Sequence, residues 1–251
     1  MKLLKMEIER LISEIKNYRL DNIVGLADVF LLCLGIFLGT GRDIFPESSL
    51  AYALLGMILW RYAVLCLGTA CSIVQREIRL GTLEQLMMAR YPLMEVVVIR
   101  LLAAMLVETV KLAVVSALLV LIFRIPLDLG ASPWLIAASV VLCLGGTVGM
   151  GCFVAGVALV YKRANALVNS LSYFTLFFTG LILPLELLPA GFSYAAALFP
   201  FRWCVEIIRG NGVQAGFGGL LAASLLWLTV GALSFSRAMG RAMACGTTAQ
   251  Y

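Results

Sequence analysis

The chain has 251 residues, of which 62% are hydrophobic and 13% are charged; it carries a formal net charge of +5 and no histidine. Soluble domains typically contain about 45–50% apolar and about 25% charged residues, so this composition excludes an ordinary soluble domain. The lack of histidine excludes imidazole general bases, Ser/His and Cys/His nucleophile pairs, and histidine metal ligands.

The apolar residues cluster into six runs, each close to the roughly 20 residues that a helix needs to cross a bilayer. The predicted spans are about 23–41, 50–74, 93–123, 134–160, 166–183 and 216–236. No connection between them reaches the ~50 residues of a second folded domain. We therefore expect an all-α integral membrane protein with six transmembrane helices. Residues 1–22 would form an amphipathic helix and residues 23–251 a single six-span domain.

The first segment, residues 2–20, has its apolar side chains on one helical face. They are Leu4, Ile8, Leu11, Ile15 and Tyr18. Because charged residues occupy the rest of the helix, this pattern predicts an interfacial helix that lies on the bilayer before the first span. A soluble amphipathic helix remains the alternative. A secretory signal peptide is disfavoured, since the segment lacks an uninterrupted apolar stretch and a small-residue cleavage site.

Between the second and third spans, residues 75–91 are polar and charged. A helix over 76–88 would place Leu80, Leu83 and Met87 on one face and direct Glu77 and Glu84 toward water. Such a helix suits docking to a soluble partner, although a solvated loop explains the composition equally well.

Before the last span, residues 184–212 are partly apolar and are interrupted by Pro184, Pro189 and Pro200. Each stretch between these prolines is too short to cross a bilayer, so we expect a re-entrant or interfacial hairpin. Within it, Cys204 is the thiol expected to face outward.

The distribution of Lys and Arg predicts the orientation. With the N-terminus inside, twelve of the 19 lie in inner segments, whereas Arg42, Arg124, Arg202 and Arg209 lie in outer segments. This asymmetry places both termini in the cytoplasm. It also accounts for the positive net charge, so a nucleic-acid partner is not expected.

Several charged residues fall within the predicted spans. Arg, Lys or Asp at the centre of a membrane helix costs about 2.5–3.5 kcal/mol unless it is paired or hydrated. Glu108 and Lys111 lie three residues apart and can pair, whereas Arg100 can snorkel toward the inner surface. Arg61 lies far from both ends of its span, so it either faces a cavity or pairs with an acid of another helix. These four residues are the candidate substrate pathway.

Three inner-loop features resemble the ABC-2 type permeases, the membrane subunits of ATP-binding cassette exporters. They are Glu77, the sequence Gly-Thr-Leu-Glu at 81–84, and Pro92 at the start of a long span. The outer segment is also similar to the family's extracellular gate and re-entrant region. Its matching residues are Pro184, Glu186, Pro189, Pro200, Glu206 and Arg209. The resemblance covers essentially the whole chain.

The resemblance implies a division of labour between polypeptides. A second permease chain, identical or homologous, would pair with this one, and two ATPase subunits carrying ATP and Mg²⁺ would dock beneath. The implied ATPase-coupling residues are Glu77, Leu80, Gly81, Thr82, Leu83, Glu84 and Met87. The N-terminal helix would be the family's connecting helix. The chain would export an amphiphile, such as a drug, lipid or glycoconjugate, across a bacterial cytoplasmic membrane.

The sequence contains no G-x-x-x-x-G-K-[ST] phosphate loop, so ATP hydrolysis would require another polypeptide. We therefore expect a transport subunit that is not itself an enzyme and has no metal or cofactor of its own. One alternative is an ATP-independent secondary transporter or channel that uses the intramembrane charges, for which inverted repeats are expected. Another is an intramembrane enzyme, which the lack of histidine and of clustered acidic ligands disfavours.

Overall fold

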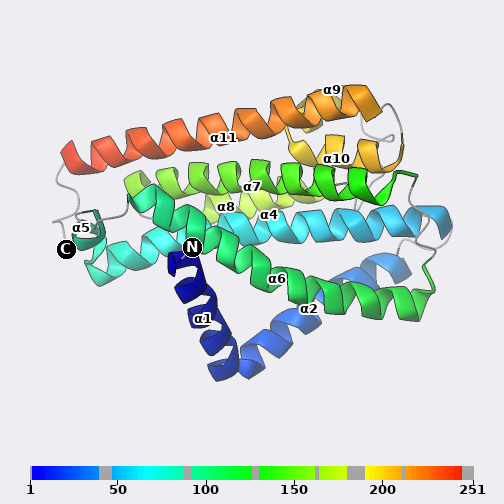
Figure 1. Cartoon of the computed structure of the whole chain (residues 1–251), viewed down its shortest axis with the longest axis horizontal. Helices are drawn as coiled ribbons and strands as arrows, with labels where there is room; N and C mark the ends of the chain where they lie inside the picture. Colours follow the sequence, from blue (N-terminus) through cyan, green and yellow to red (C-terminus); the bar gives the residue numbers. More distant parts are fainter. Residues whose placement is uncertain are drawn as a thin grey trace.

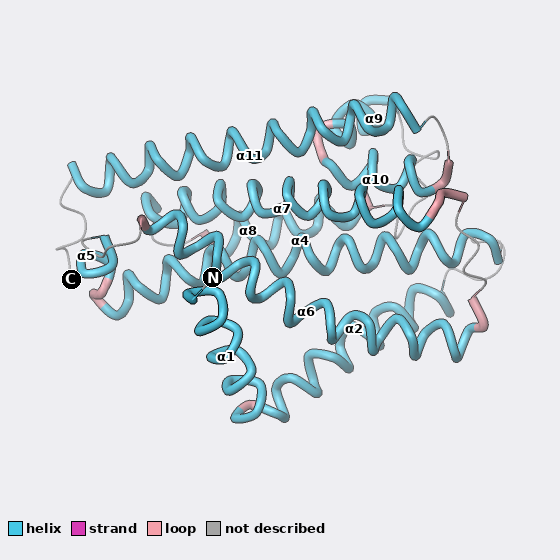
Figure 2. Tube along the Cα trace, viewed as in Figure 1, coloured by secondary structure: helices cyan, strands magenta, loops and turns pink. Residues whose placement is uncertain are grey.

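The computed structural model describes residues 2–39, 47–87, 92–125, 130–161, 164–179, 190–210 and 213–244. All regular secondary structure in these residues is helical (Figure 2). The helices are α1 (Lys2–Asn17), α2 (Arg19–Gly39), α4 (Glu47–Leu80), α5 (Leu83–Met87), α6 (Leu93–Phe123), α7 (Pro133–Tyr161), α8 (Asn165–Phe178), α9 (Ala190–Ala197), α10 (Pro200–Ile208) and α11 (Val213–Ala244).

Four of these helices, α4, α6, α7 and α11, are long and apolar enough to cross a membrane. The 31 residues of α6 extend about 46 Å at ~1.5 Å per residue, well beyond the ~30 Å hydrocarbon core. The predicted spans 93–123 and 134–160 agree with α6 and α7 to within a residue at each end. The described part of the chain is therefore all-α and has several helices of spanning length.

The fifth predicted span is shorter in the structure, whereas α2 has 21 residues and covers positions 23–39 of the first. The described apolar part of α2 is Asn22–Gly35. Helix α8 has 14 residues, or about 21 Å, and residues 180–189 after it lie outside the described part of the chain. Six crossings therefore stay a prediction.

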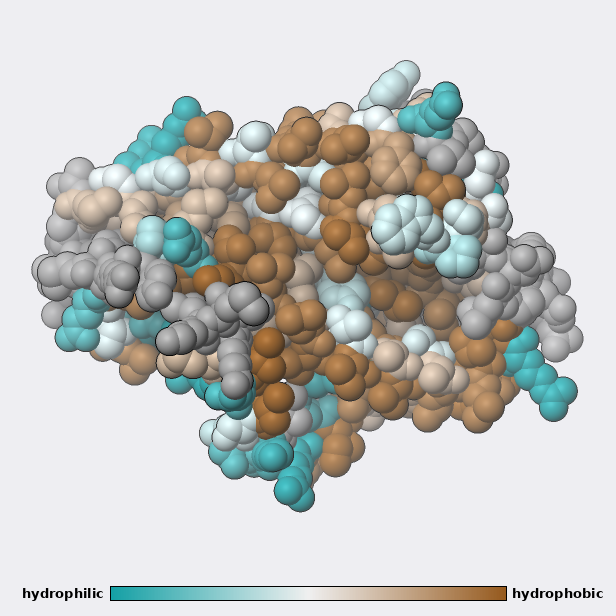
Figure 3. Space-filling view, viewed as in Figure 1, coloured by the Kyte–Doolittle hydropathy of each residue, from teal (hydrophilic) through white to brown (hydrophobic). Residues whose placement is uncertain are grey.

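The long helices form a layered bundle in which α7 lies between α4 and α11 (Figure 1). On the other side of α4, α6 packs against α4 and carries α1 and α2 on its outer surface. Helix α1 crosses the long axis of the bundle steeply (Figure 1), and its position on a bilayer surface stays a prediction. In the space-filling view, apolar side chains gather across the middle of the visible face and hydrophilic ones lie toward its ends and over α1 (Figure 3).

Glycines bring the backbones of α7 and α11 into direct contact. A Cβ atom added to Gly149 would lie 2.5 Å from the carbonyl carbon of Trp227, and one added to Gly156 would lie 3.0 Å from Cα of Phe235. Glycine has no side chain to hold the two backbones apart. Close contact of this kind stabilises membrane helix pairs, because they associate mainly through van der Waals packing. The glycine-rich segment of α7 therefore serves helix packing.

The end of the bundle opposite α5 contains two short helices, α9 and α10 (Figure 1). Helix α10 packs against α7 and α11, and Phe201, Val205 and Ile208 are buried in this contact. Cys204 is also fully buried, so the expectation that its thiol faces outward is wrong. Burial follows from the amphipathic pattern of α10, which directs one face of the outer segment into the protein.

We predict that Gly149→Ala destabilises the protein, because the new methyl group would overlap the backbone of α11. Overpacking of this kind typically costs about 1–3 kcal/mol. Gly145→Ala is the matched control, since a Cβ there has no neighbour within 4 Å and alanine favours the same helix. Thermal unfolding in detergent measures both variants. Equal melting temperatures would show that the α7–α11 contact does not require glycine at this position.

Candidate functional site

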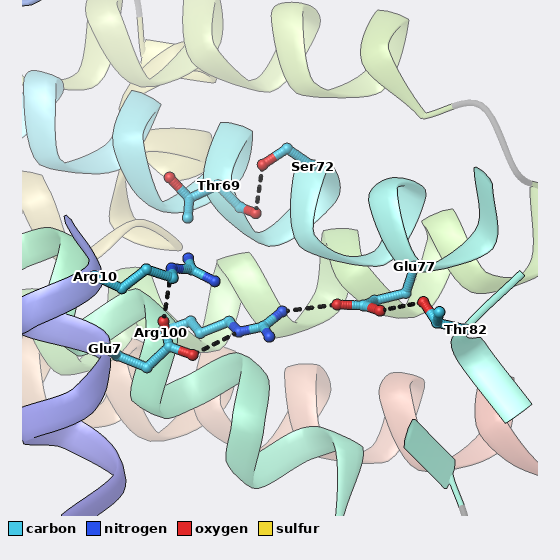
Figure 4. Close-up of polar contacts among 7 residues, drawn as sticks. All are labelled: Glu7, Arg10, Thr69, Ser72, Glu77, Thr82 and Arg100. Atoms are coloured by element: carbon cyan, nitrogen blue, oxygen red, sulfur yellow. Dashed lines mark hydrogen bonds and ion pairs between the residues drawn. The ribbon is translucent and has the colours of Figure 1, made fainter. Parts of the chain in front are cut away.

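A network of ion pairs joins three helices near the end of the bundle that the sequence predicts to be the inner one (Figure 4). We call it the inner network and define it as Glu7, Arg10, Glu77, Thr82 and Arg100. Arg100 of α6 donates from Nε to Glu7 Oε1 of α1 at 3.1 Å and from Nη1 to Glu77 Oε1 of α4 at 3.0 Å. Each arm of one guanidinium thus holds a carboxylate from a different helix.

Two further contacts complete the inner network. The hydroxyl of Thr82 donates to Glu77 Oε2 at 2.6 Å, and Arg10 Nε lies 3.2 Å from Glu7 Oε2. The side chains of Glu7 and Glu77 are each 13% exposed, and that of Arg100 is 17% exposed. Two arginines balance two carboxylates, so the network carries no net charge.

The end of α4 explains how Thr82 reaches Glu77. Gly81 adopts φ +68°, in the left-handed region that favours glycine. Its N–H donates to the carbonyl of Ile78 at 3.2 Å, and the N–H of Thr82 donates to the carbonyl of Glu77 at 3.1 Å. This pair of bonds is a Schellman motif, which ends the helix and reverses the chain. The reversal returns the Thr82 side chain to Glu77 and starts α5.

The predicted helix over 76–88 is therefore wrong: α4 ends at Leu80 and α5 begins at Leu83. Leu80 is 63% exposed whereas Leu83 is 6% exposed, so these two residues do not share a face. Glu77 was expected to face water but is largely buried against Arg100. The side chains of Glu84 and Met87 lie outside the described part of the structure.

The arrangement around Arg100 also differs from the sequence expectation. Arg100 does not extend alone to the inner surface, because Glu7 and Glu77 are within reach and neutralise it. Removing one member of a buried ion pair costs about 3–5 kcal/mol, since the remaining charge loses its partner. The inner network therefore fixes α1, α4 and α6 relative to one another.

A second cluster lies farther along α4 and α6, and we call it the span cluster: Asn22, Arg61, Glu108 and Lys111. Arg61 Nε donates to Glu108 Oε1 at 2.8 Å, and Lys111 Nζ lies 3.9 Å from Glu108 Oε2. Lys111 also donates to Asn22 Oδ1 of α2 at 2.7 Å. The Glu108–Lys111 contact is confirmed, although Arg61 is the closer partner.

Both possibilities raised for Arg61 are realised. It pairs with an acid of another helix, and it also lines a cavity of about 180 Å³ together with Lys111 and Glu108. The structure thus brings three of the four candidate pathway residues together, and it places Arg100 in the separate inner network.

The outer segment contributes a third set of predicted residues. Pro184, Glu186 and Pro189 lie outside the described residues. Pro200 begins α10 at the first helical position, which proline favours. Glu206 Oε1 lies 2.9 Å from Arg202 Nε, and the Arg209 guanidinium lies 5.3 Å from the Tyr52 ring centre. Helices α9 and α10 are each too short to cross a bilayer, and a re-entrant path remains a prediction.

Sequence reasoning missed Glu7, Arg10 and Asn22. Glu7 and Arg10 are three residues apart on α1, a spacing that indicates a shared face. No local pattern shows that this face meets α6, because the contact joins residues 93 positions apart. Among the described residues, no three Cys, Asp or Glu side chains are placed to hold a metal ion.

The comparisons with known proteins agree with the helical architecture. The family model described as ABC-2 type transporter matches residues 11–213 of the chain. The search of curated proteins found no significant match. The matched range contains every residue of the span cluster, and it contains Glu77, Thr82 and Arg100 of the inner network. The chain therefore belongs to the ABC-2 type transporter family and is a multi-pass membrane permease component.

Proposed function

We propose that this chain is the membrane subunit of an exporter driven by two separate ATP-binding cassette ATPases. Members of the family normally work with such ATPase subunits. Each complex would contain a second permease chain, identical or homologous to this one. ATP and Mg²⁺ would be held by the ATPases, since this sequence lacks a phosphate loop.

The observation that carries this proposal is the connection of α5 to the inner network. Helix α5 follows α4 after the reversal at Gly81, and Thr82 binds Glu77 on the last turns of α4. Through Arg100, Glu77 is joined to α1 and α6. An ATPase that docks on α5 and moves it would therefore displace three helices together.

Helix α4 extends that displacement into the bilayer. Glu77 and Arg61 lie on this one continuous helix, about 24 Å apart at ~1.5 Å per residue. A movement that begins at α5 thus reaches the Arg61–Glu108 pair without any flexible link. We infer that ATP binding and hydrolysis expose the span cluster first to one side of the membrane and then to the other.

The substrate in this proposal is an amphiphile that leaves the cytoplasm or inner leaflet of a bacterial cytoplasmic membrane. Arg61, Glu108 and Lys111 supply polar contacts along its path, and the neighbouring helix faces are aliphatic. Arg100 acts instead in coupling, because both of its carboxylate partners belong to the inner network.

The direct test is transport in vesicles that contain this chain and the ABC ATPase encoded nearest to its gene. We expect the two proteins to co-purify and to export an amphiphilic substrate only with ATP. Replacing the catalytic glutamate of that ATPase by glutamine should abolish export. Continued export by the complex with the inactive ATPase would instead indicate an ATP-independent transporter.

Arg100→Lys tests whether the helices are coupled by the two hydrogen bonds that the guanidinium donates to different carboxylates. Lysine keeps the charge but presents a single ammonium group, which cannot hold Glu7 and Glu77 in the same bidentate manner. We expect export per ATP hydrolysed to fall severalfold while ATP hydrolysis continues.

The matched control for this variant is Arg79→Lys, at an exposed arginine in the last turn of α4. Melting temperatures of both variants separate a loss of coupling from a loss of folding. If both variants are folded and export the same amount of substrate per ATP hydrolysed, the inner network does not couple the helices.

Gly81→Ala tests the reversal between α4 and α5. Alanine in the left-handed conformation costs roughly 1–2 kcal/mol, whereas Gly81 has no neighbour within 4 Å that a methyl group would strike. The variant should therefore change the direction of α5 through the backbone alone, and it should weaken co-purification with the ATPase.

Two further substitutions sharpen this test. Gly81→Asn should retain binding, because asparagine tolerates the left-handed conformation. Gly68→Ala, within α4 and also without neighbours, should have no effect. If Gly81→Ala binds the ATPase as well as Gly68→Ala does, the reversal is not needed for docking.

A further inference from the structure

An apolar groove lies between α1, α2 and α6, beside the span cluster. It has a volume of about 530 Å³, and its walls include Ile12, Ile23, Leu106 and Val110. Ile23 is 64% exposed and Val110 is 67% exposed, so the groove is open at the side of the bundle. Its size and lining are typical of a small-molecule site, where apolar walls surround a few placed polar groups.

The groove adjoins the smaller cavity that contains the Arg61–Glu108 pair. Asn22, Leu26 and Lys111 line both spaces. Lys111 is therefore placed at the junction, with its ammonium group 2.7 Å from Asn22 Oδ1. A molecule with its chain in the groove would bring its head group to Lys111.

The charges of the two spaces do not balance. Their described lining contains three cationic side chains, Arg19, Arg61 and Lys111, and one carboxylate, Glu108. Glu108 lies 2.8 Å from Arg61 but 3.9 Å from Lys111, so it mainly neutralises Arg61. A cation at membrane depth is unfavourable without a counter-charge. An anionic group at the junction would supply it.

From this geometry we propose that the groove binds an anionic amphiphile, with an acidic head group at Lys111 and an apolar chain between α1, α2 and α6. The chain alone gives no selectivity, because bilayer lipids offer it equally apolar surroundings. Selectivity would come from the charge at Lys111. The proposal concerns binding and is tested without an ATPase, so it stands or fails separately from the proposed transport function.

Native mass spectrometry of the purified chain in detergent provides the test, with phosphatidylglycerol as the anionic probe and phosphatidylcholine of the same chains as the zwitterionic probe. The unmodified protein should prefer phosphatidylglycerol. Lys111→Gln should reduce that preference by about tenfold, the scale of one hydrogen bond to a charged group. Arg237→Gln, at an exposed cation of α11 outside both spaces, should leave it unchanged.

A second pair of variants tests the groove without altering charge. Val110→Trp should block the chain and reduce phosphatidylglycerol binding, whereas Val114→Trp, one turn farther along the exposed face of α6, should not. Melting temperatures confirm that each variant is folded. Inorganic phosphate alone should neither bind at Lys111 nor displace the lipid.

Four results would overturn the proposal. The first two are equal binding of both lipids by the unmodified protein and an unchanged preference for phosphatidylglycerol in Lys111→Gln. The third is that inorganic phosphate binds as strongly as phosphatidylglycerol. The fourth is that Val110→Trp changes the oligomeric state of the protein without changing its lipid preference. The last result would show that a second copy of the chain covers the groove.

Discussion

Charged side chains within long apolar helices must find partners, and this constraint determines how α4 meets α6. Water is scarce at membrane depth, so an unpaired charge there is strongly unfavourable. Arg100 pairs with Glu77 near the end of α4, and Arg61 pairs with Glu108 farther along the two helices. Because each pair joins α4 to α6, two separated contacts define the register and rotation of one helix against the other. The positions of α1 and α2 then follow from Glu7 and Asn22.

The opposite side of the bundle is held in a different way. Helices α7 and α11 touch through the backbones at Gly149 and Trp227, where there is no room for even a methyl group. Such a contact cannot slide without collision, since packed interfaces are not continuously deformable. A conformational change would therefore move α7 and α11 as one unit, and the ion pairs would likewise move α4 and α6 together.

Hydropathy and residue spacing predicted much of the fold because they report local properties. The apolar runs located α6 and α7 to within a residue at each end. Local patterns did not predict the partners of Arg100, which lie 23 and 93 positions away. They predicted one helix over 76–88 because its amphipathic spacing continues through Gly81. The available signal for the break was Gly81 itself, a residue favoured just after the end of a helix.

The balance of charge distinguishes the two polar clusters. In the inner network, Arg10 and Arg100 match Glu7 and Glu77, and the Thr82 hydroxyl occupies a remaining carboxylate oxygen. All of its charges are neutralised within the protein, so its members can connect the helices without a ligand. The span cluster has one carboxylate for two cations and adjoins an open groove. Among the described residues, the span cluster thus keeps an excess of positive charge that a ligand can neutralise, which is the basis for proposing binding there and only a structural role for the inner network.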